Sequence, residues 1–283
     1  MYISIDLGGT NTRIASSKDL IEILDVIKVK TEQDVELERN IIDSSIKKLC
    51  DGEEIEGLCI GVPGLIDKEK KIFEKIPNIP AFDNISFEDF IGNISSLDST
   101  IIENDASLAG LGEAVRGAGK NYNVVAYLTL STGVGGVRIS GKKLDPYQGH
   151  SEPGHMVIEE GGKVCEHCHQ AGCLSAYTSG KSFEKNYGTS SSECTDQDIW
   201  NEYANKLSLG LINIMADWGP EVIVLGGSIS NKFEEYFKKP LLEELKKQDF
   251  FEIPPIVKSE LDDNSGIYGG FEALKQAGFL KNG

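Results

Sequence analysis

Residues 2–17 read "YISIDLGGTNTRIASS", a short apolar strand, a glycine turn and a second short strand. The same order returns at residues 124–141, "VVAYLTLSTGVGGVRISG", where the turn is again built from glycine and threonine. Two hairpins of this kind indicate an internal duplication. Strands alternate with helices between them, so the sequence predicts an α/β fold.

Hydrophobic periodicity predicts the remaining elements. Helices are expected over residues 34–50, from residue 106 onward, through 199–218 and over 269–280, and strands over 57–64, 100–103 and 221–228. The domain boundary is expected near residues 113–121, at the end of the helix that follows "ENDA".

The charge balance excludes several classes of partner. The 283 residues include 28 basic and 45 acidic side chains, a formal net charge of −17, which repels nucleic acid and anionic membrane surfaces. The N-terminus lacks the features of a signal peptide, and no apolar run is long enough to span a bilayer. We therefore expect a cytoplasmic protein, in which the six cysteines do not form a disulfide framework.

A glycine turn lets backbone N–H groups approach an anion, because no Cβ blocks it. Taken singly, such a turn is more often a plain hairpin turn. The stretch "SAYTSGKS" at 175–182 comes near the P-loop pattern, but Ser175 replaces its first glycine and no strand precedes it. No GxGxxG leads from a strand into a helix either. The turns therefore predict a phosphate clamp of another kind.

Two carboxylates accompany the turns. Asp6 ends the first strand, where it can hold a hydrated magnesium ion, while Thr10, Thr12 and Thr132 offer hydroxyls beside the glycine amides. Asp105 follows a buried strand at the start of a helix. It is either the N-cap of that helix or a general base.

Residues 152–173, "EPGHMVIEEGGKVCEHCHQAGC", place three histidines and three cysteines on one glycine-rich loop. In a reducing compartment this crowding favours a metal site, with a disulfide and reduced thiols without metal as the alternatives. Cys50, Cys59 and Cys194 are interpreted as ordinary thiols, and the acids Glu159 and Glu160 are expected to face solvent.

These motifs, taken in order, resemble the ROK family (repressor, open reading frame, kinase), especially its glucokinase-like members. They are "DLGGTNTR" at 6–13, "GVPGLID" at 61–67, "PNIPAF" at 77–82, "ENDASLAGLGE" at 103–113, "LSTGVGG" at 130–136, "EPGH" at 152–155, the cysteine cluster and "VLGGS" at 224–228. The resemblance implies two actin-like (ribonuclease-H-like) ATPase domains, residues 1–115 and 116–268, with a cleft between them and a zinc-binding loop at 152–175. The C-terminal helix, 269–283, is expected to pack back on the first domain.

The resemblance also implies an ATP-dependent sugar kinase of glycolysis that uses Mg²⁺ and forms a homodimer. Asp105 would accept the proton of a hexose hydroxyl as that oxygen attacks the γ-phosphate, with glucose giving glucose 6-phosphate. The residues implied to line the sugar are Gly64, Asn78, Asn104, Asp105, Glu152 and His155. Those implied to bind the nucleotide are Asp6, Gly8, Gly9, Thr10, Thr12, Thr132, Gly133, Gly226 and Gly227.

The zinc ligands implied by the resemblance are His155, Cys165, Cys168 and Cys173, a closed shell typical of structural zinc. The second imidazole nitrogen of the histidine would then face the sugar. The chain departs from the family in having two residues between its first two cysteines and His169 in place of a glycine, so His167 or His169 is expected to compete as a ligand.

A second departure concerns the sugar. The family usually has a glutamate that contacts the sugar two residues after the last cysteine, and this chain has Ser175. Fructose, mannose, an N-acylmannosamine or N-acetylglucosamine are therefore alternative substrates. A non-catalytic, sugar-binding ROK regulator is the alternative function. ROK repressors carry a helix-turn-helix before the first strand, which here begins at Tyr2, so the kinase is the favoured interpretation.

Overall fold

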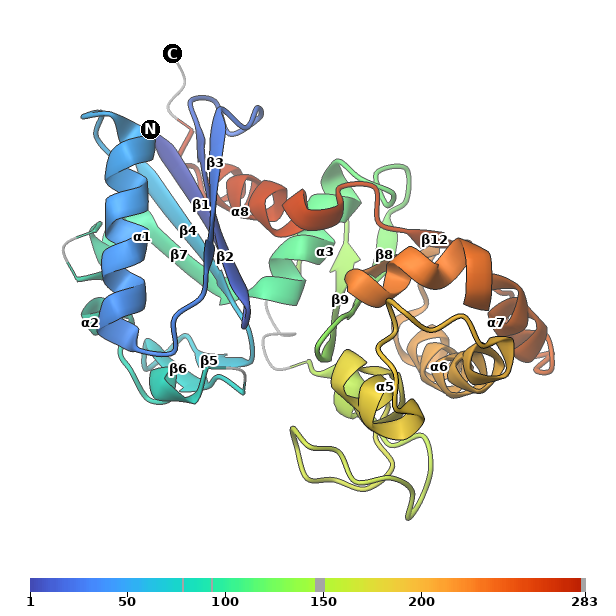
Figure 1. The fold of residues 1–283 in the computed structure, drawn as a ribbon. Coiled ribbons are helices and arrows are strands. Elements are labelled where there is room, and N and C mark those ends of the chain that lie inside the picture. The colour runs from blue at the N-terminus through green and yellow to red at the C-terminus, as the bar shows by residue number, and fades with distance from the viewer. Residues whose placement is uncertain (78, 93, 146–150, 281–283) are drawn as a thin grey trace. The chain divides into compact units, whose positions relative to one another are not determined.

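The computed structural model describes residues 1–77, 79–92, 94–145 and 151–280 (Figure 1). The chain divides into two compact units. Unit 1 comprises Met1–Arg116 together with Asn264–Gly283, and unit 2 comprises Gly117–Asp263. Each unit has its own five-stranded sheet.

The sheet of unit 1 has the strand order β3-β2-β1-β4-β7. Its strands are β1 (Tyr2–Leu7), β2 (Asn11–Ser17), β3 (Asp25–Lys30), β4 (Gly57–Val62) and β7 (Thr100–Asn104). The first three strands are antiparallel, whereas β1 pairs in parallel with β4, and β4 with β7. The carboxyl ends of three parallel strands therefore lie at one edge, where α/β sheets usually bind ligands.

Helices cover both faces of this sheet (Figure 1). On one face lie α1 (Val35–Cys50) and α2 (Phe87–Ile91), with the hairpin β5 (Leu65–Asp67) and β6 (Ile72–Lys75) and the 3₁₀ turns Pro80–Phe82 and Leu97–Ser99 nearby. On the other face lie α3 (Asp105–Val115) and α8 (Ser265–Gln276).

Glycines allow α3 and α8 to approach closely. A Cβ at Gly269 would overlap with the carbonyl group of Leu108, and a Cβ at Gly112 would overlap with that of Ser265. The expectation that the last helix begins at residue 269 was wrong, since α8 begins at Ser265. Glycine lowers helix propensity, but here the glycines lie inside a helix because the packing leaves no room for a side chain.

The sheet of unit 2 repeats the pattern of unit 1, with the order β10-β9-β8-β11-β12. Its strands are β8 (Val124–Leu130), β9 (Val134–Ser140), β10 (Lys143–Leu144), β11 (Val222–Gly226) and β12 (Ile256–Lys258). As in unit 1, an antiparallel hairpin is followed by strands that pair in parallel with its first strand and with each other. The predicted duplication is confirmed.

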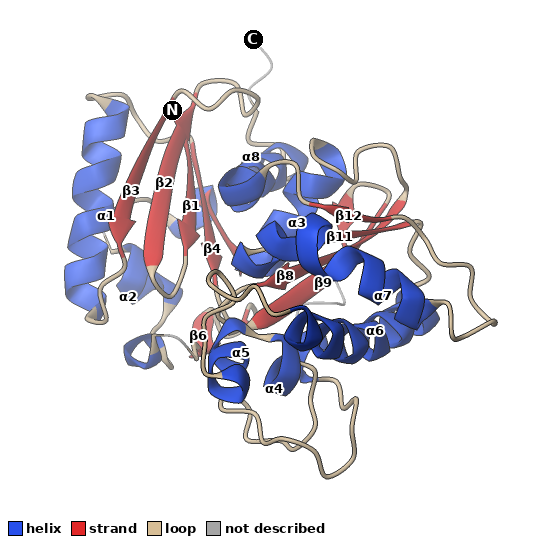
Figure 2. Ribbon diagram, turned by 45° about the vertical axis from the view of Figure 1, so that its right-hand side comes forward, coloured by secondary structure: helices blue, strands red, loops and turns tan. Residues whose placement is uncertain are grey.

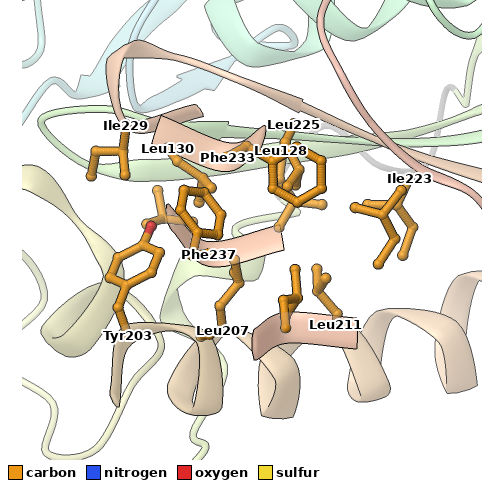
Figure 3. Packing of buried hydrophobic residues seen from close by; sticks show 14 of the residues in the cluster. Leu128, Leu130, Tyr203, Leu207, Leu211, Ile223, Leu225, Ile229, Phe233 and Phe237 are labelled. Carbon is orange, nitrogen blue, oxygen red and sulfur yellow. The ribbon is translucent and has the colours of Figure 1, made fainter. Parts of the chain in front are cut away.

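One large hydrophobic core lies between this sheet and its helices. The long helix α6 (Gln197–Trp218) presents Tyr203, Leu207 and Leu211 to strand residues Leu128 and Leu225 (Figure 3). Figure 2 shows α6 beside α7 (Lys238–Leu245). The remaining elements are α4 (Ser175–Thr178), α5 (Gly180–Tyr187), the π-helical turn Phe233–Phe237 and the 3₁₀ turns Pro153–His155, Ser228–Lys232 and Asp262–Asn264.

The strands and helices predicted from periodicity correspond to β4, β7, β11, α1 and α6. None of the helices in the described part of the chain has both the length and the apolar character that a bilayer span needs.

Candidate active site and metal centre

Several predicted site residues lie at the carboxyl edge of the unit 1 sheet. Asp6 is near the end of β1, Gly64 follows β4, and Asn104 ends β7. The strand register pairs Asp6 with Gly61 and Val62 with Asn104, so these positions share one edge. Gly64 has a φ of +83°, and a Cβ there would overlap with the Lys75 carbonyl oxygen, so this position needs glycine. Asn78 lies outside the described residues.

Asp105 is the first residue of α3, and the N-cap is its neighbour Asn104. The Asn104 side chain accepts the N–H of Ser107 at 3.0 Å and donates to the carbonyl oxygen of Gly64 at 3.1 Å. The interpretation of Asp105 as the cap was therefore wrong. Its half-buried carboxylate accepts the N–H of Ala106 at 2.7 Å, and the helix N-terminus favours its ionised form.

Asp6 lies between an arginine of β2 and the start of α8. Its carboxylate is half-buried and lies 3.6 Å from Nη1 of Arg13. The backbone of Gly266, at the start of α8, lies against it, since a Cβ there would be 3.2 Å from the Asp6 carboxyl carbon. Magnesium at kinase sites uses one or two carboxylates plus water and phosphate oxygens, which fits this single acid.

Two hydrogen bonds within unit 1 hold the first glycine turn in its conformation. The Gly8 N–H donates to the Asn11 carbonyl at 3.1 Å, and the Thr31 hydroxyl donates to the Gly8 carbonyl at 2.6 Å. Gly9 and Thr10 form the tip, where Thr10 is exposed. The Gly8 amide is therefore occupied within the hairpin, and the amides at the tip are the better candidates for phosphate.

Thr12 does not lie where a nucleotide contact was expected. Its side chain is fully buried, and its hydroxyl donates to Oε1 of Glu38 at 2.6 Å and lies 2.9 Å from the Thr31 hydroxyl. Alternation along β2 turns Thr12 toward α1, which carries the buried Glu38. Thr12 and Glu38 thus support the turn through Thr31, and the geometry does not support direct contact with a ligand.

We expect Thr12→Val to lower the free energy of unfolding by about 1 to 3 kcal/mol, because it removes a hydrogen bond from the buried Glu38 carboxylate. Thr12→Ser keeps the hydroxyl and is the matched control, with a loss below about 1 kcal/mol. Urea unfolding measures both. A valine variant as stable as the serine variant would contradict this role for the hydroxyl.

The two glycine turns of unit 2 lie at the carboxyl edge of its sheet. Residues 131–133 connect β8 to β9, with Thr132 exposed and open space around Gly133. Gly226 ends β11 opposite Thr129, and Gly227 has a φ of +81° with its backbone against Leu130. Thr132, Gly133, Gly226 and Gly227 are therefore neighbours in this unit.

Four side chains of the 152–173 loop converge in an arrangement that could hold a metal ion. The ligand atoms of His155, Cys165, Cys168 and Cys173 all lie within 4.8 Å of one another. Cys173 Sγ is 3.9 Å from Cys168 Sγ and 3.9 Å from His155 Nδ1. A tetrahedron with zinc–sulfur bonds of about 2.3 Å has edges of about 3.8 Å, so the residues fit zinc.

The remaining histidines of the loop are placed elsewhere. Burial, followed by the nearby charge of Lys181, lowers the pKa of His167, and Nε2 of its ring is buried without a hydrogen-bond partner among the described residues. His169 is exposed in the left-handed region, with a φ of +59°. The geometry therefore favours His155 over both as the fourth ligand.

All six cysteines are free thiols, so no disulfide forms. Burial acts to raise the pKa of Cys165, but hydrogen bonds from the backbone of Cys168 and His167 lower it below its ordinary value. Burial raises the pKa of Cys173 to about 12. Three thiolates this close repel one another, and a bound cation removes that cost. Cys50, Cys59 and Cys194 are buried outside the cluster.

Glu159 is not the purely solvent-facing acid that was expected. Its carboxylate accepts hydrogen bonds from the hydroxyl of Tyr177 and, at 3.0 Å, from Nζ of Lys206 on α6. These contacts tie the metal loop to the body of unit 2. Glu160 is exposed, as expected.

Glu152 precedes the Pro153–His155 turn, and its carbonyl oxygen accepts the His155 N–H at 2.9 Å. Burial raises the pKa of the Glu152 carboxyl to about 7. Ser175, at the start of α4, is only 1% exposed, and its hydroxyl would be 2.8 Å from a Cβ at Gly154. Ser175 is therefore enclosed by its neighbours, in a space that fits a small side chain.

We expect Glu152→Gln to stabilise the protein at neutral and alkaline pH but not at acidic pH. The folded-state pKa lies above the ordinary value of 4.5, so the native protein loses stability as the pH rises from about 4.5 to 7. The variant carries no charge, and its advantage should grow over this range to about 2 kcal/mol at pH 8. Thermal unfolding at pH 5 and 8 measures it. Glu160→Gln, at an exposed acid of the same loop, should show no such difference.

Comparison with known proteins gives the family. A model of the ROK family matches residues 2–277. The chain belongs to the ROK family. A glucokinase of Thermotoga maritima is 29% identical over 313 aligned residues that cover 97% of each protein. A xylose repressor of Bacillus spizizenii is 35% identical over 189 residues, which are 61% of this chain and 48% of the repressor.

The solved structures agree on the fold. A ROK hexokinase from Thermus thermophilus aligns with 97% of this ROK chain and 99% of its own, with a TM-score of 0.83 and 24% identity. The chain therefore has the actin-like α/β fold of ROK sugar kinases.

Sequence reasoning missed Glu38 and Thr31, because a charged residue on an amphipathic helix and a threonine after a strand carry no signal of their own.

Proposed function

We propose that this ROK protein is an ATP-dependent sugar kinase that transfers the γ-phosphate of MgATP to a hexose hydroxyl, with glucose the leading substrate. The observation that carries the proposal is Asp105. Its carboxylate is half-buried at the first position of α3, at the sheet edge that also carries Asp6 and Asn104. The similarity over nearly the whole length to a glucokinase supports the same activity.

Asp105 is the proposed general base. A helix N-terminus favours a negatively charged side chain, and the capping bonds of Asn104 fix the backbone that carries Asp105. The base would take the proton of the sugar hydroxyl while that oxygen forms its bond to the γ-phosphorus and the bond to the β-phosphate oxygen breaks. Phosphoryl transfer depends mainly on positioning and charge stabilisation, so the placement of this residue decides the rate.

The glycine turns are the proposed nucleotide-binding residues. In unit 1, the amides at Gly9 and Thr10 would contact phosphate oxygens, and Asp6 would hold magnesium, which neutralises phosphate charge when bound. In unit 2, Thr132 and Gly133 would contact phosphates, and Gly226 with Gly227 would lie against the adenosine.

The zinc loop is proposed to orient sugar-binding residues. His155 faces Cys173 with Nδ1, and Nε2 is the ring nitrogen that is proposed to contact the sugar. Glu152 is the second candidate in this loop, and Gly64 with Asn104 are the candidates in unit 1. Asn78 stays a prediction from the sequence.

A different sugar is the second candidate, and Ser175 favours it. A buried serine cannot provide the two acceptor oxygens of the family's usual glutamate. Fructose, mannose, N-acylmannosamine and N-acetylglucosamine are therefore the next substrates to test. The similarity to a xylose repressor gives the non-catalytic regulator as the remaining alternative.

A panel of these sugars, each assayed by coupled release of ADP with MgATP, tests the proposal. We expect one hexose to give kcat/KM at least tenfold above the others, against a background of ATP hydrolysis measured without sugar. Saturable sugar binding by calorimetry with no ADP release for any member would favour the regulator.

A further inference from the structure

Strand β7 runs directly into helix α3, so the end of this strand sets the position of Asp105. Asn104 is the last residue of β7 and Asp105 is the first residue of α3, with no loop between them. The backbone of Asn104 has a φ of −64° and a ψ of 138°, and rotation about either bond would move the Asp105 carboxylate. The groups that hold Asn104 therefore also position the proposed base.

The backbone of Asn104 is held by the residue before it. The Asn104 N–H donates to Oε1 of Glu103 at 3.0 Å, in addition to the bonds that the Asn104 side chain makes with Ser107 and Gly64. Glu103 lies on β7 and is only 7% exposed. The conformation at the junction of strand and helix therefore depends on where the Glu103 carboxylate is held.

Lys68 holds this carboxylate through its other oxygen. Nζ of Lys68 lies 2.5 Å from Oε2 of Glu103, so each oxygen of Glu103 has a partner. A buried carboxylate without a nearby cation is costly, and it would turn toward water or take up a proton. The lysine therefore keeps Glu103 ionised and in the orientation in which it accepts the Asn104 N–H.

The same ion pair joins β7 to the β5–β6 hairpin. Gly64 lies immediately before β5 and Lys68 immediately after it. Neighbouring residues of β7 bond to both ends of this short strand, since Asn104 donates to the Gly64 carbonyl oxygen and Glu103 pairs with Lys68. The ion pair thus also holds Gly64 and Asn104, two of the proposed sugar-binding residues, against each other within unit 1.

We propose that Lys68 and Glu103 are positioning residues, whose ion pair fixes Asn104 and, through it, the Asp105 carboxylate beside the sugar-binding residues of unit 1. The proposal rests on the proposed function, because it takes Asp105 as the general base and Gly64 and Asn104 as contacts of the sugar. Lys68 and Glu103 act through Asn104 and need no contact with the sugar themselves.

Steady-state phosphorylation of the best sugar of the panel by the full zinc-loaded chain is the first test. Lys68→Met keeps most of the side-chain length without the charge. It should lower kcat/KM for the sugar about 5- to 20-fold, between the effects of an exposed and a buried pair, because the Lys68 side chain is 50% exposed. The KM for MgATP should stay within about twofold. Lys68→Arg can form the same ion pair and should recover most of the loss.

Lys70→Met is the matched control. Lys70 lies in the same turn, and its Nζ is 2.8 Å from Oδ2 of Asp67, but this ion pair stays within the hairpin and does not reach β7. The control should keep the wild-type kinetics. The double variant Lys68→Met with Glu103→Gln should lose no more activity than Lys68→Met alone, because the two residues act as one unit.

Amide hydrogen exchange, followed by NMR without any ligand, is the second test. The N–H groups of Asn104 and Ser107 depend directly on the proposed link. Both should exchange at least about fivefold faster in Lys68→Met, while the amides of the central strand β4 keep their rates. A general loss of stability would speed the exchange of β4 as well.

In Lys68→Met, wild-type exchange of the Asn104 and Ser107 amides or a wild-type kcat/KM would each overturn the proposal, as would a loss of activity that Lys70→Met shares. Failure of the wild type to phosphorylate any sugar of the panel is a different result. It would overturn the proposed function, and the positioning role with it, whatever the exchange rates are.

Discussion

Asp105→Asn is expected to lower kcat about 10²- to 10⁴-fold, the usual contribution of a general base. Asparagine has nearly the same shape and keeps an oxygen to accept the Ala106 N–H, which Asp105 now accepts at 2.7 Å. It cannot accept a proton from the sugar. The fold, the zinc content and the KM for ATP should therefore change little.

The measurement is steady-state phosphorylation of the best sugar, with thermal unfolding and metal analysis on the same samples. Asp98→Asn, at an exposed acid of the same unit, is the control and should retain wild-type turnover. An Asp105→Asn variant that keeps more than a tenth of the wild-type kcat would rule out Asp105 as the base.

Loss of zinc is expected to have the other large effect. Cys173 Sγ lies 3.9 Å from both Cys168 Sγ and His155 Nδ1, so Cys173→Ser removes a ligand from the middle of the site. We expect the zinc content to fall from about one ion per chain to near zero. The KM for sugar should rise about 10- to 100-fold, because His155 loses its fixed orientation.

Metal analysis of freshly purified, reduced protein and sugar kinetics measure these effects. Cys194→Ser is the control, since Cys194 is a buried thiol of the same unit outside the cluster, and it should keep its zinc. A Cys173→Ser variant that retains both zinc and the wild-type KM for sugar would contradict the ligand assignment.

The elements with strong patterns could be predicted from the sequence. The two glycine hairpins, the buried strands β4 and β11 and the long helix α6 have continuous or periodic apolar residues. The strands β3 and β12 were missed, because β3 is an edge strand with charged residues facing solvent and β12 has only three residues. The start of α8 was missed because its glycines serve packing against α3.

The sequence could predict which residue types belong to the candidate site. It could not predict which hydrogen bonds join them. Asp105, Asp6 and the cysteine cluster can be recognised in the sequence because few residue types can act as a general base or as a metal ligand. The inward direction of the Thr12 hydroxyl depends on a partner, Glu38, that the chain brings to it only on folding.

The most direct test of the account is ³¹P and ¹³C NMR of the wild-type chain with MgATP and uniformly ¹³C-labelled glucose. The account predicts that the γ-phosphate signal is replaced by a phosphomonoester signal in equal amount, with phosphorus coupling at carbon 6 of the sugar. Release of the γ-phosphate only as inorganic phosphate, or no reaction with glucose or any other sugar of the panel, would contradict it.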